Sequence, residues 1–346
     1  MLRRHPGNPI LTKDDLPYPG TLVYNPGVVR AGDRCVMVFR VDHGYSPGRI
    51  GYGFETIDLG IAYSDDGIVW DVQNRTVLST LKNDENIWAY DPRLVCVGGS
   101  ELLLTFCLDT RHGMRAGVAR TTDFETFEVI SLSLPDLRNV VLFPELVDGR
   151  YVRLERPFPI YLRRTWGQHD RFDIWLSKSP DLRHWGDTEL VLAVEEVPYA
   201  TEKIGPGPPP VLTPGGWLTI FHAVDTGPNR PVSGWEGTWA KRYTAGAMLL
   251  DRLDPARVLG ITPEPILVPE APYEMTSGFR PNVVFPTGVV VEGDEALVYY
   301  GASDSVICVA TASVDELLAT IQPATAEPTE LAARAAAVAT PEPATG

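Results

Sequence analysis

The apolar residues of this chain fall into many short runs rather than a few long ones. The runs are rich in β-branched and aromatic residues, about four to eight positions each, and turn residues such as Gly and Pro separate them. No long segment with helical periodicity precedes the C-terminal stretch, so the pattern predicts an all-β body. Representative runs are Leu22–Val29, Cys35–Val41, Leu102–Leu108, Trp217–Val224 and Ala296–Tyr300.

A weak internal repeat refines this prediction. A strand, a polar turn centred on an aspartate and an aromatic residue recur around Asp66, Asp123 and Asp181, which lie 57 and 58 residues apart. Weaker copies follow at Met248–Asp254 and Val309–Asp315. A repeat of this size holds four strands with their turns, which is one propeller blade. Five copies predict a five-bladed β-propeller over residues 1–322; a two-sheet sandwich followed by another domain is the alternative.

Residues 323–346 differ from the body because they are rich in Ala, Pro and Thr and carry almost no large apolar side chain. Such a segment buries little surface, so we expect a disordered tail with at most a transient short helix.

Motifs that place Pro or Gly beside a polar group recur about once per predicted blade, where a strand begins. In a propeller these positions face a shared channel, where a site is expected. Asp91 is the main candidate, since Pro92 biases it towards an extended backbone and a fixed carboxylate suits proton transfer to a leaving group. An ordinary Asp-Pro turn is the alternative. The motifs are Tyr24-Asn25-Pro26-Gly27, Tyr90-Asp91-Pro92-Arg93, Phe143-Pro144-Glu145, Gly205–Pro210 and Arg280–Pro286.

Composition narrows the classes of function. A formal net charge of −15 and the lack of a basic run argue against a nucleic-acid partner. The N-terminus lacks a secretory signal and no window is apolar enough for a membrane span, so we expect a cytoplasmic protein without a membrane partner. The cysteines have no C-x-x-C spacing, which favours buried free thiols over a zinc or redox site. They are Cys35, Cys96, Cys107 and Cys308.

Four cations lie at predicted blade junctions: Arg111, Arg156, Lys203 and His222. Clustered cations in an acidic protein suit an anion such as phosphate. Pairing with surface carboxylates is the alternative. Aromatic residues near the same loops suit a sugar ring, although core packing is the commoner role of such side chains.

These motifs together resemble glycoside hydrolase family 130, the β-mannoside phosphorylases and related β-mannosidases, which are five-bladed β-propellers. The resemblance runs from about Asn25 to Leu318. Besides the first two motifs above, it rests on Arg111-His112-Gly113, Asn139–Glu145, Arg156-Pro157, Lys203–Pro209, His222–Asp225, Pro281–Pro286 and Tyr300–Asp304.

The resemblance implies inverting phosphorolysis of β-mannosides, or the reverse synthesis. Asp91 would donate a proton to the glycosidic oxygen, relayed through a mannose hydroxyl, while inorganic phosphate attacks the anomeric carbon and gives α-mannose 1-phosphate. The phosphate would be bound by Arg111, Arg156, Lys203 and His222. The mannose would be bound by Asn25, Arg40, Tyr90 and Asp304. No cofactor or metal is implied beyond phosphate as co-substrate.

One departure keeps a second activity open. Glu155 stands where many phosphorylases of the family have histidine, and a carboxylate beside a phosphate site would repel a dianion unless it points away or pairs with Arg153. An inverting β-mannosidase, with Glu155, Glu145 or Glu274 as base, is therefore the alternative, and a non-catalytic glycan-binding propeller is the second. The Gly234–Trp239 loop is expected to lie over the channel and contact the acceptor sugar. Linkage, acceptor, physiological direction and oligomeric state, homo-oligomers included, stay open.

Overall fold

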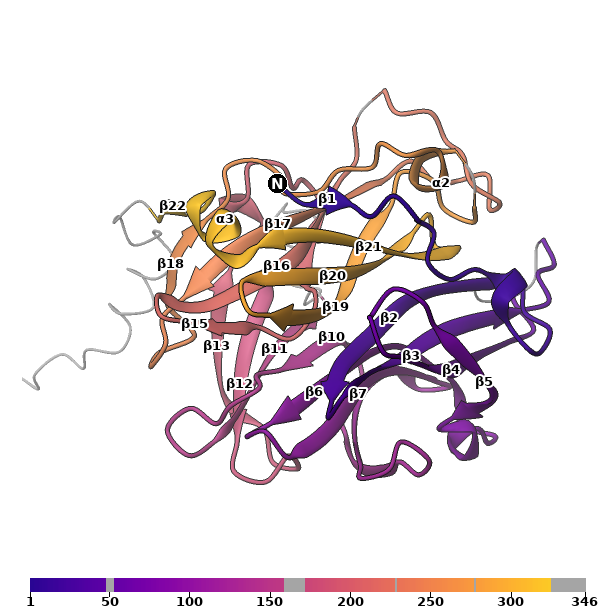
Figure 1. Cartoon of the computed structure of the whole chain (residues 1–346), viewed down its shortest axis with the longest axis horizontal. Coiled ribbons are helices and arrows are strands. Elements are labelled where there is room, and N and C mark those ends of the chain that lie inside the picture. The colour runs from indigo at the N-terminus through magenta and orange to yellow at the C-terminus, as the bar shows by residue number, and fades with distance from the viewer. Residues whose placement is uncertain (48–52, 159–171, 228, 277, 325–346) are drawn as a thin grey trace, which may run out of the picture.

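The computed structural model describes residues 1–47, 53–158, 172–227, 229–276 and 278–324. Its strands form five sheets, each built from antiparallel neighbours, in the arrangement of a five-bladed β-propeller (Figure 1). The all-β, five-bladed prediction is confirmed, and the sandwich alternative is wrong.

The first three blades each contain four consecutive strands. Blade 1 comprises β2 (Leu22–Ala31), β3 (Arg34–His43), β4 (Thr56–Ser64) and β5 (Asp71–Val77). Blade 2 comprises β6 (Asn86–Val97), β7 (Glu101–Thr110), β8 (Gly113–Thr121) and β9 (Glu128–Leu132). Blade 3 comprises β10 (Leu137–Leu142), β11 (Tyr151–Pro157), β12 (Ile174–Ser179) and β13 (Gly186–Leu192).

The last two blades use the ends of the described chain. Blade 4 contains β14 (Lys203–Pro206), β15 (Val211–Thr213), β16 (Gly216–Asp225), β17 (Arg242–Leu250) and β18 (Val258–Ile261), with β22 (Gln322–Pro323) at its edge. Blade 5 contains β19 (Val284–Glu292), β20 (Glu295–Ala302) and β21 (Val306–Ser313), and β1 (Arg3–Arg4) pairs with β21. Figure 1 shows the N-terminal strand beside these late strands. The pairing joins the start of the chain to its last full blade and covers an edge that would otherwise be open.

The repeated aspartates hold the same turn in four blades. Asp66 Oδ1 accepts hydrogen bonds from the backbone N–H groups two and three residues later, at 2.8 Å each. Asp123, Asp181 and Asp251 make the same pair of bonds. The repeat is therefore an Asx-type turn between the last two consecutive strands of each of these blades: β4 and β5, β8 and β9, β12 and β13, and β17 and β18. In blade 5 the copy differs, because Ser313 caps helix α3 (Val314–Ala319) and Asp315 lies in its first turn.

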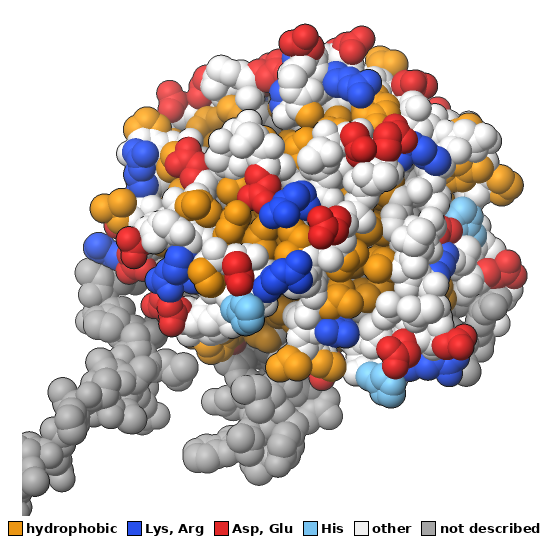
Figure 2. Space-filling model, turned by 90° about the horizontal axis from the view of Figure 1, so that it is seen from below, with side chains coloured by type: hydrophobic (Ala, Val, Ile, Leu, Met, Phe, Trp, Pro, Cys, Tyr) orange, Lys and Arg blue, Asp and Glu red, His pale blue; other side chains and the backbone are white. Residues whose placement is uncertain are grey.

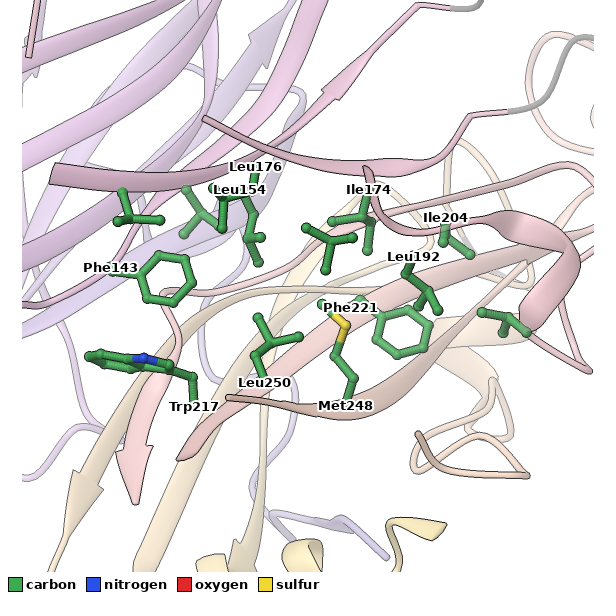
Figure 3. Close-up of a cluster of buried hydrophobic side chains, with 14 of the residues drawn as sticks. Phe143, Leu154, Ile174, Leu176, Leu192, Ile204, Trp217, Phe221, Met248 and Leu250 are labelled. Carbon is green, nitrogen blue, oxygen red and sulfur yellow. The ribbon is translucent and has the colours of Figure 1, made fainter. Parts of the chain in front are cut away.

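Hydrophobic side chains fill the spaces between neighbouring blades. Between blades 3 and 4, Phe143 and Trp217 meet edge to face with their ring centroids 5.0 Å apart, and aliphatic side chains surround them (Figure 3). Cys35, Cys107 and Cys308 are buried free thiols, as predicted, and Cys96 is free and partly buried. This packing fixes the inner strands that carry the site.

Among the described residues, the other helical elements are short: Lys13–Asp15, Ser79–Leu81, Val194–Glu196 and α2 (Pro272–Met275). Within the described ranges, no helix has the length and apolar character to cross a bilayer; the cytoplasmic location stays a prediction. On the face in Figure 2, basic and acidic side chains are interspersed. The predicted tail is outside the described residues from position 325 onwards, and β22 marks where the described chain last joins a blade.

Candidate active site

Bulges in the inner strands of blades 1, 2 and 3 each place one short polar side chain in the same cavity. The register shifts beside Asn25, Asp91 and Asn139, and these residues have φ angles of 52°, 50° and 54°. The expectation that Pro92 makes Asp91 extended is therefore wrong. Asp91 lies inside β6 in the left-handed region, which Asp and Asn tolerate better than other side chains, and the bulge outweighs the proline bias.

The cavity between the blades has a volume of about 240 Å³. Every blade contributes to its lining, so residues far apart in sequence meet there. Its wall consists of Tyr24, Asn25, Arg40, Asp91, Arg138, Asn139, Arg156, Lys203, Trp239, Lys241, Tyr243, Arg280, Val283, Phe285 and Asp304.

Asp91 is buried among cations. Asn25 Nδ2 donates a hydrogen bond to Asp91 Oδ1 at 2.8 Å, Arg40 Nη1 lies 3.5 Å from the same oxygen, and Arg138 Nη2 lies 3.3 Å from Oδ2. Burial raises the pKa of Asp91, but the charges of Arg40, Arg138 and Arg93 outweigh it and hold the pKa below its ordinary value. Without a bound anion, Asp91 is thus a carboxylate that binds a proton weakly.

A second carboxylate, that of Asp42, fixes the orientation of the Arg40 guanidinium. Its Nε and Nη2 atoms donate to the two oxygens of the buried Asp42 at 2.6 and 2.8 Å. Tyr24 donates to Asp42 as well, at 2.8 Å, and the Arg40 guanidinium lies 4.9 Å from the centroid of the Tyr90 ring. The remaining nitrogen, Nη1, is therefore directed at Asp91 by a bidentate pair of fixed geometry.

Further along the cavity lining, Arg138, Arg156 and Lys203 concentrate positive charge. Burial and then the neighbouring Arg138 lower the pKa of Arg156 to about 10. Burial and then Arg156 hold the pKa of Lys203 well below its ordinary value, although Glu202 lies 3.5 Å away. Among the described residues no carboxylate pairs with Arg156. An anion between these cations would relieve their mutual repulsion.

His222 lies behind this group rather than in the cavity lining. It is fully buried, and its Nε2 is 3.4 Å from Arg156 Nη1. Burial and then Arg156 hold its pKa well below the ordinary value, so the ring is neutral at pH 7. A Cβ atom at Gly205 would lie 2.5 Å from the His222 ring and 3.2 Å from Arg156 Cδ, so only glycine fits beside them.

Comparisons with known proteins agree with this geometry. The family model Glyco_hydro_130, described as beta-1,4-mannooligosaccharide phosphorylase, matches residues 4–322. The chain belongs to glycoside hydrolase family 130.

Three proteins to which the chain is similar are named phosphorylases of β-mannosides. The chain is 31% identical over 331 residues to a beta-1,4-mannooligosaccharide phosphorylase of Ruminococcus albus, covering 92% of this chain and 90% of the relative. It is 32% identical over 271 residues to a 1,2-beta-oligomannan phosphorylase of Thermoanaerobacter sp., covering 77% and 82%. A solved beta-1,2-mannobiose phosphorylase from Listeria innocua, in complex with beta-1,2-mannobiose, superposes with a TM-score of 0.78 at 26% identity over 92% of this chain and 99% of that one.

Most residues assigned through the family resemblance meet in the cavity. Asp91, Asn25, Arg40, Asp304, Arg156 and Lys203 line it. Tyr90 is buried beneath Arg40 and Arg138 and donates to Asp109 Oδ1 at 2.7 Å, so it supports the two guanidinium groups.

Arg111 does not join them. Its side chain is exposed, and its Nε donates to the carbonyl oxygen of Asp84, outside the cavity. Arg138 stands beside Asp91 instead, and sequence reasoning gave neither Arg138 nor Asn139 a role. The available signal was positional: Asn139 occupies in blade 3 the place that Asn25 and Asp91 occupy in blades 1 and 2.

The three glutamates considered as a hydrolytic base also lie elsewhere. Glu155 accepts hydrogen bonds from Arg153 Nε at 2.7 Å and Ser177 Oγ at 3.1 Å, because strand alternation sends it to the opposite face of β11 from Arg156. Glu145 is exposed. Glu274 is buried against Arg4 and Tyr300, which donate to it at 2.9 and 2.8 Å. None of the three lines the cavity.

Proposed function

We propose that this chain catalyses the phosphorolysis of β-mannosides with inversion, releasing α-mannose 1-phosphate and a shortened sugar. The observation that carries this proposal is the buried carboxylate of Asp91 in one cavity with the buried Arg156 and the partly buried Arg138 and Lys203. The phosphorylase names of relatives with 1,2- and 1,4-linked substrates support it.

The cation group suits phosphate. Arg138, Arg156 and Lys203 bring two guanidinium groups and one ammonium to the lining of the cavity. Guanidinium groups bind phosphate oxygens in pairs, and the depressed pKa of Lys203 is restored when a dianion approaches. Asn139 Oδ1 and Arg156 Nε are buried and lack hydrogen-bond partners among the described residues, so a ligand with hydroxyl and oxyanion groups would satisfy them.

The sugar side holds the mannosyl unit through Asn25, Arg40 and Asp304. Burial raises the pKa of Asp304 to about 6 against the opposing charges of Arg280 and Arg40, so the carboxylate is ionised at neutral pH and accepts sugar hydroxyl protons. Asn25 Oδ1 is another buried acceptor without a partner among the described residues.

In the reaction, a phosphate oxygen forms a bond to the anomeric carbon while the bond to the glycosidic oxygen breaks. Asp91 supplies the proton that this leaving oxygen takes, through a mannose hydroxyl. The negative charge of phosphate beside Arg138 offsets the cations that hold the Asp91 pKa low, so phosphate binding promotes protonation of the acid. Phosphate is itself the nucleophile, so a second carboxylate base is unnecessary.

The test is the phosphate dependence of β-mannobiose cleavage. The 1,4- and 1,2-linked disaccharides are incubated with the protein with and without inorganic phosphate, and α-mannose 1-phosphate and free mannose are measured. We expect mannose 1-phosphate only with phosphate, and the preferred disaccharide identifies the linkage. Free mannose released equally fast without phosphate would identify a hydrolase. Binding of either sugar without turnover would identify a glycan-binding propeller.

A further inference from the structure

The Gly234–Trp239 loop of blade 4 docks on the segment that leads into blade 5. The backbone N–H of Trp235 donates to the Phe279 carbonyl oxygen at 3.0 Å, and the Trp239 indole N–H donates to the Pro281 carbonyl oxygen at 2.8 Å. Tyr45 from blade 1 reaches the same loop and donates to the Trp235 carbonyl oxygen at 3.1 Å. The loop thus crosses from one blade to the next beside the cavity.

Arg280 connects this loop to the sugar side of the cavity. Its Nε and Nη2 atoms donate to the two oxygens of Glu236 at 2.9 and 3.0 Å, while its Nη1 lies 3.6 Å from Asp304 Oδ2. The guanidinium carbon is also 4.8 Å from the centroid of the Trp239 ring. A separation of 3.6 Å is too long for a hydrogen bond, so Glu236, rather than Asp304, determines the direction of the guanidinium.

The same arrangement occurs once more in the cavity. Asp42 holds Arg40 through a bidentate pair, and Arg40 Nη1 lies 3.5 Å from the cavity carboxylate of Asp91. In both cases a carboxylate outside the cavity lining, Asp42 or Glu236, holds the guanidinium through two hydrogen bonds. The same guanidinium lies 3.5 or 3.6 Å from a carboxylate of the lining, Asp91 or Asp304. Asp42 and Arg40 are two residues apart on β3, whereas Glu236 and Arg280 come from different blades.

We propose that Glu236 is a positioning residue for the sugar pocket: it holds Arg280 away from Asp304, so that the oxygens of Asp304 stay available to a sugar hydroxyl. The inference rests on the proposed sugar-binding role of Asp304. Without the Glu236 charge, the guanidinium moves towards Asp304 and competes with the sugar for it. Sugar affinity therefore depends on the docked loop, while phosphate binding on the opposite side of the cavity does not.

The first experiment measures steady-state kinetics of mannobiose phosphorolysis by Glu236→Gln. The substitution keeps the size of the side chain and the backbone contacts of the loop. We expect the KM for mannobiose to rise about tenfold, with the KM for phosphate and kcat unchanged. Glu236→Asp retains the charge and should recover most of the affinity. Glu125→Gln, which removes the partner of Arg75 in a surface pair of 3.0 Å, is the matched control and should match the wild type.

The second measurement is the acid limb of the pH profile, that is, the pH at which kcat/KM for the sugar falls on the acidic side. A purely structural role of Glu236 would not shift this pH in a defined direction. Glu236→Gln should lower the pH of this limb, because Arg280 comes closer to Asp304. Arg280→Gln should raise it, because a cation is lost. The other charged groups that face Asp304 and stay constant are Arg40, Asp91 and Asp42.

An unchanged KM for mannobiose in Glu236→Gln, an equal rise in the KM for phosphate, or limb shifts in the same direction in both variants would overturn the inference. If the wild type cleaves no β-mannoside, the proposed function fails separately. The inference is then tested by calorimetric binding of mannose, which should be weaker in Glu236→Gln, and equal affinity would overturn it.

Discussion

The two sides of the cavity hold their charges in opposite ways. On the sugar side, each guanidinium has a dedicated carboxylate: Asp42 for Arg40 and Glu236 for Arg280. On the anion side, Arg138, Arg156 and Lys203 lower the pKa values of one another or of their neighbours. Paired charges fix geometry at little cost in ligand affinity, whereas crowded like charges store an unfavourable energy that an anion releases. Under the proposed function, the paired charges orient the groups that bind the sugar, and the crowded cations attract the phosphate.

Removing the charge of Asp91 should have the largest effect, because Asp91 lies where the two sides meet. Asp91→Asn should lower kcat for phosphorolysis about 10³-fold, the range expected for a lost general acid. The fold, checked by circular dichroism, should stay intact. A wild-type rate in this variant would remove Asp91 from the mechanism.

A second substitution separates the two sides. Arg156→Ala should raise the KM for phosphate about 30-fold and leave the KM for mannobiose nearly unchanged, since a charge-assisted contact is lost on one side only. Arg111→Ala is the matched control, because Arg111 is an exposed arginine outside the cavity. Equal effects of the two variants would contradict the placement of the anion site.

Glu155 provides a test of stability rather than of turnover. Glu155→Gln should lower the free energy of unfolding by about 2–3 kcal/mol, because it leaves the buried Arg153 without its charged partner. The ratio of phosphorolysis to hydrolysis should not change. Glu145→Gln, at an exposed position, should alter neither quantity. A shift towards phosphorolysis in Glu155→Gln would show that this carboxylate acts in the reaction. Urea unfolding and product analysis measure the two effects.

The smallest expected effect concerns pH. With the pKa of Asp304 at about 6, kcat/KM for the sugar should fall as the pH drops through this value, and Asp304→Asn should abolish this limb. The raised pKa of Asp304 makes folding stability depend on pH in the opposite direction from kcat/KM. Its contribution to stability is fully present below the unfolded value of about 3.9 and is lost as the pH rises through 6. The stability of Asp304→Asn relative to the wild type should therefore be higher above pH 6 than at low pH, which thermal unfolding of both proteins at pH 4 and pH 7 would detect.

The sequence predicted the fold best where the same short-range interaction recurs along the chain. Asp66, Asp123 and Asp181 mark equivalent turns because an Asx turn needs only one side chain and its own backbone. The copy at Asp315 fitted less well because a helix replaces the turn. The closing pairs of β1 and β22 were not foreseen, since two-residue strands carry no periodic signal.

The site was readable in part. The motif identified Asp91 as a candidate but did not predict its left-handed backbone. The bulge arises from pairing between strands, whereas the proline rule considers only the neighbouring residue. Arg111 lies in the turn between β7 and β8, and Arg138 lies at the start of β10. Only the three-dimensional register decides that Arg138 points inwards to Asp91 and that Glu155 points away.

The cavity wall has a consequence for biosynthesis. Its lining residues extend from Tyr24 to Asp304, and the strand that follows Asp304 must be made before β1 can pair with it. On the ribosome, the early blades therefore emerge long before any catalytic centre exists. A product truncated before β19 would contain β2 to β18 but lack Phe285 and Asp304 of the wall. Such fragments would lack part of the site, so enzymatic activity reports synthesis at least as far as Asp304 in the fifth blade.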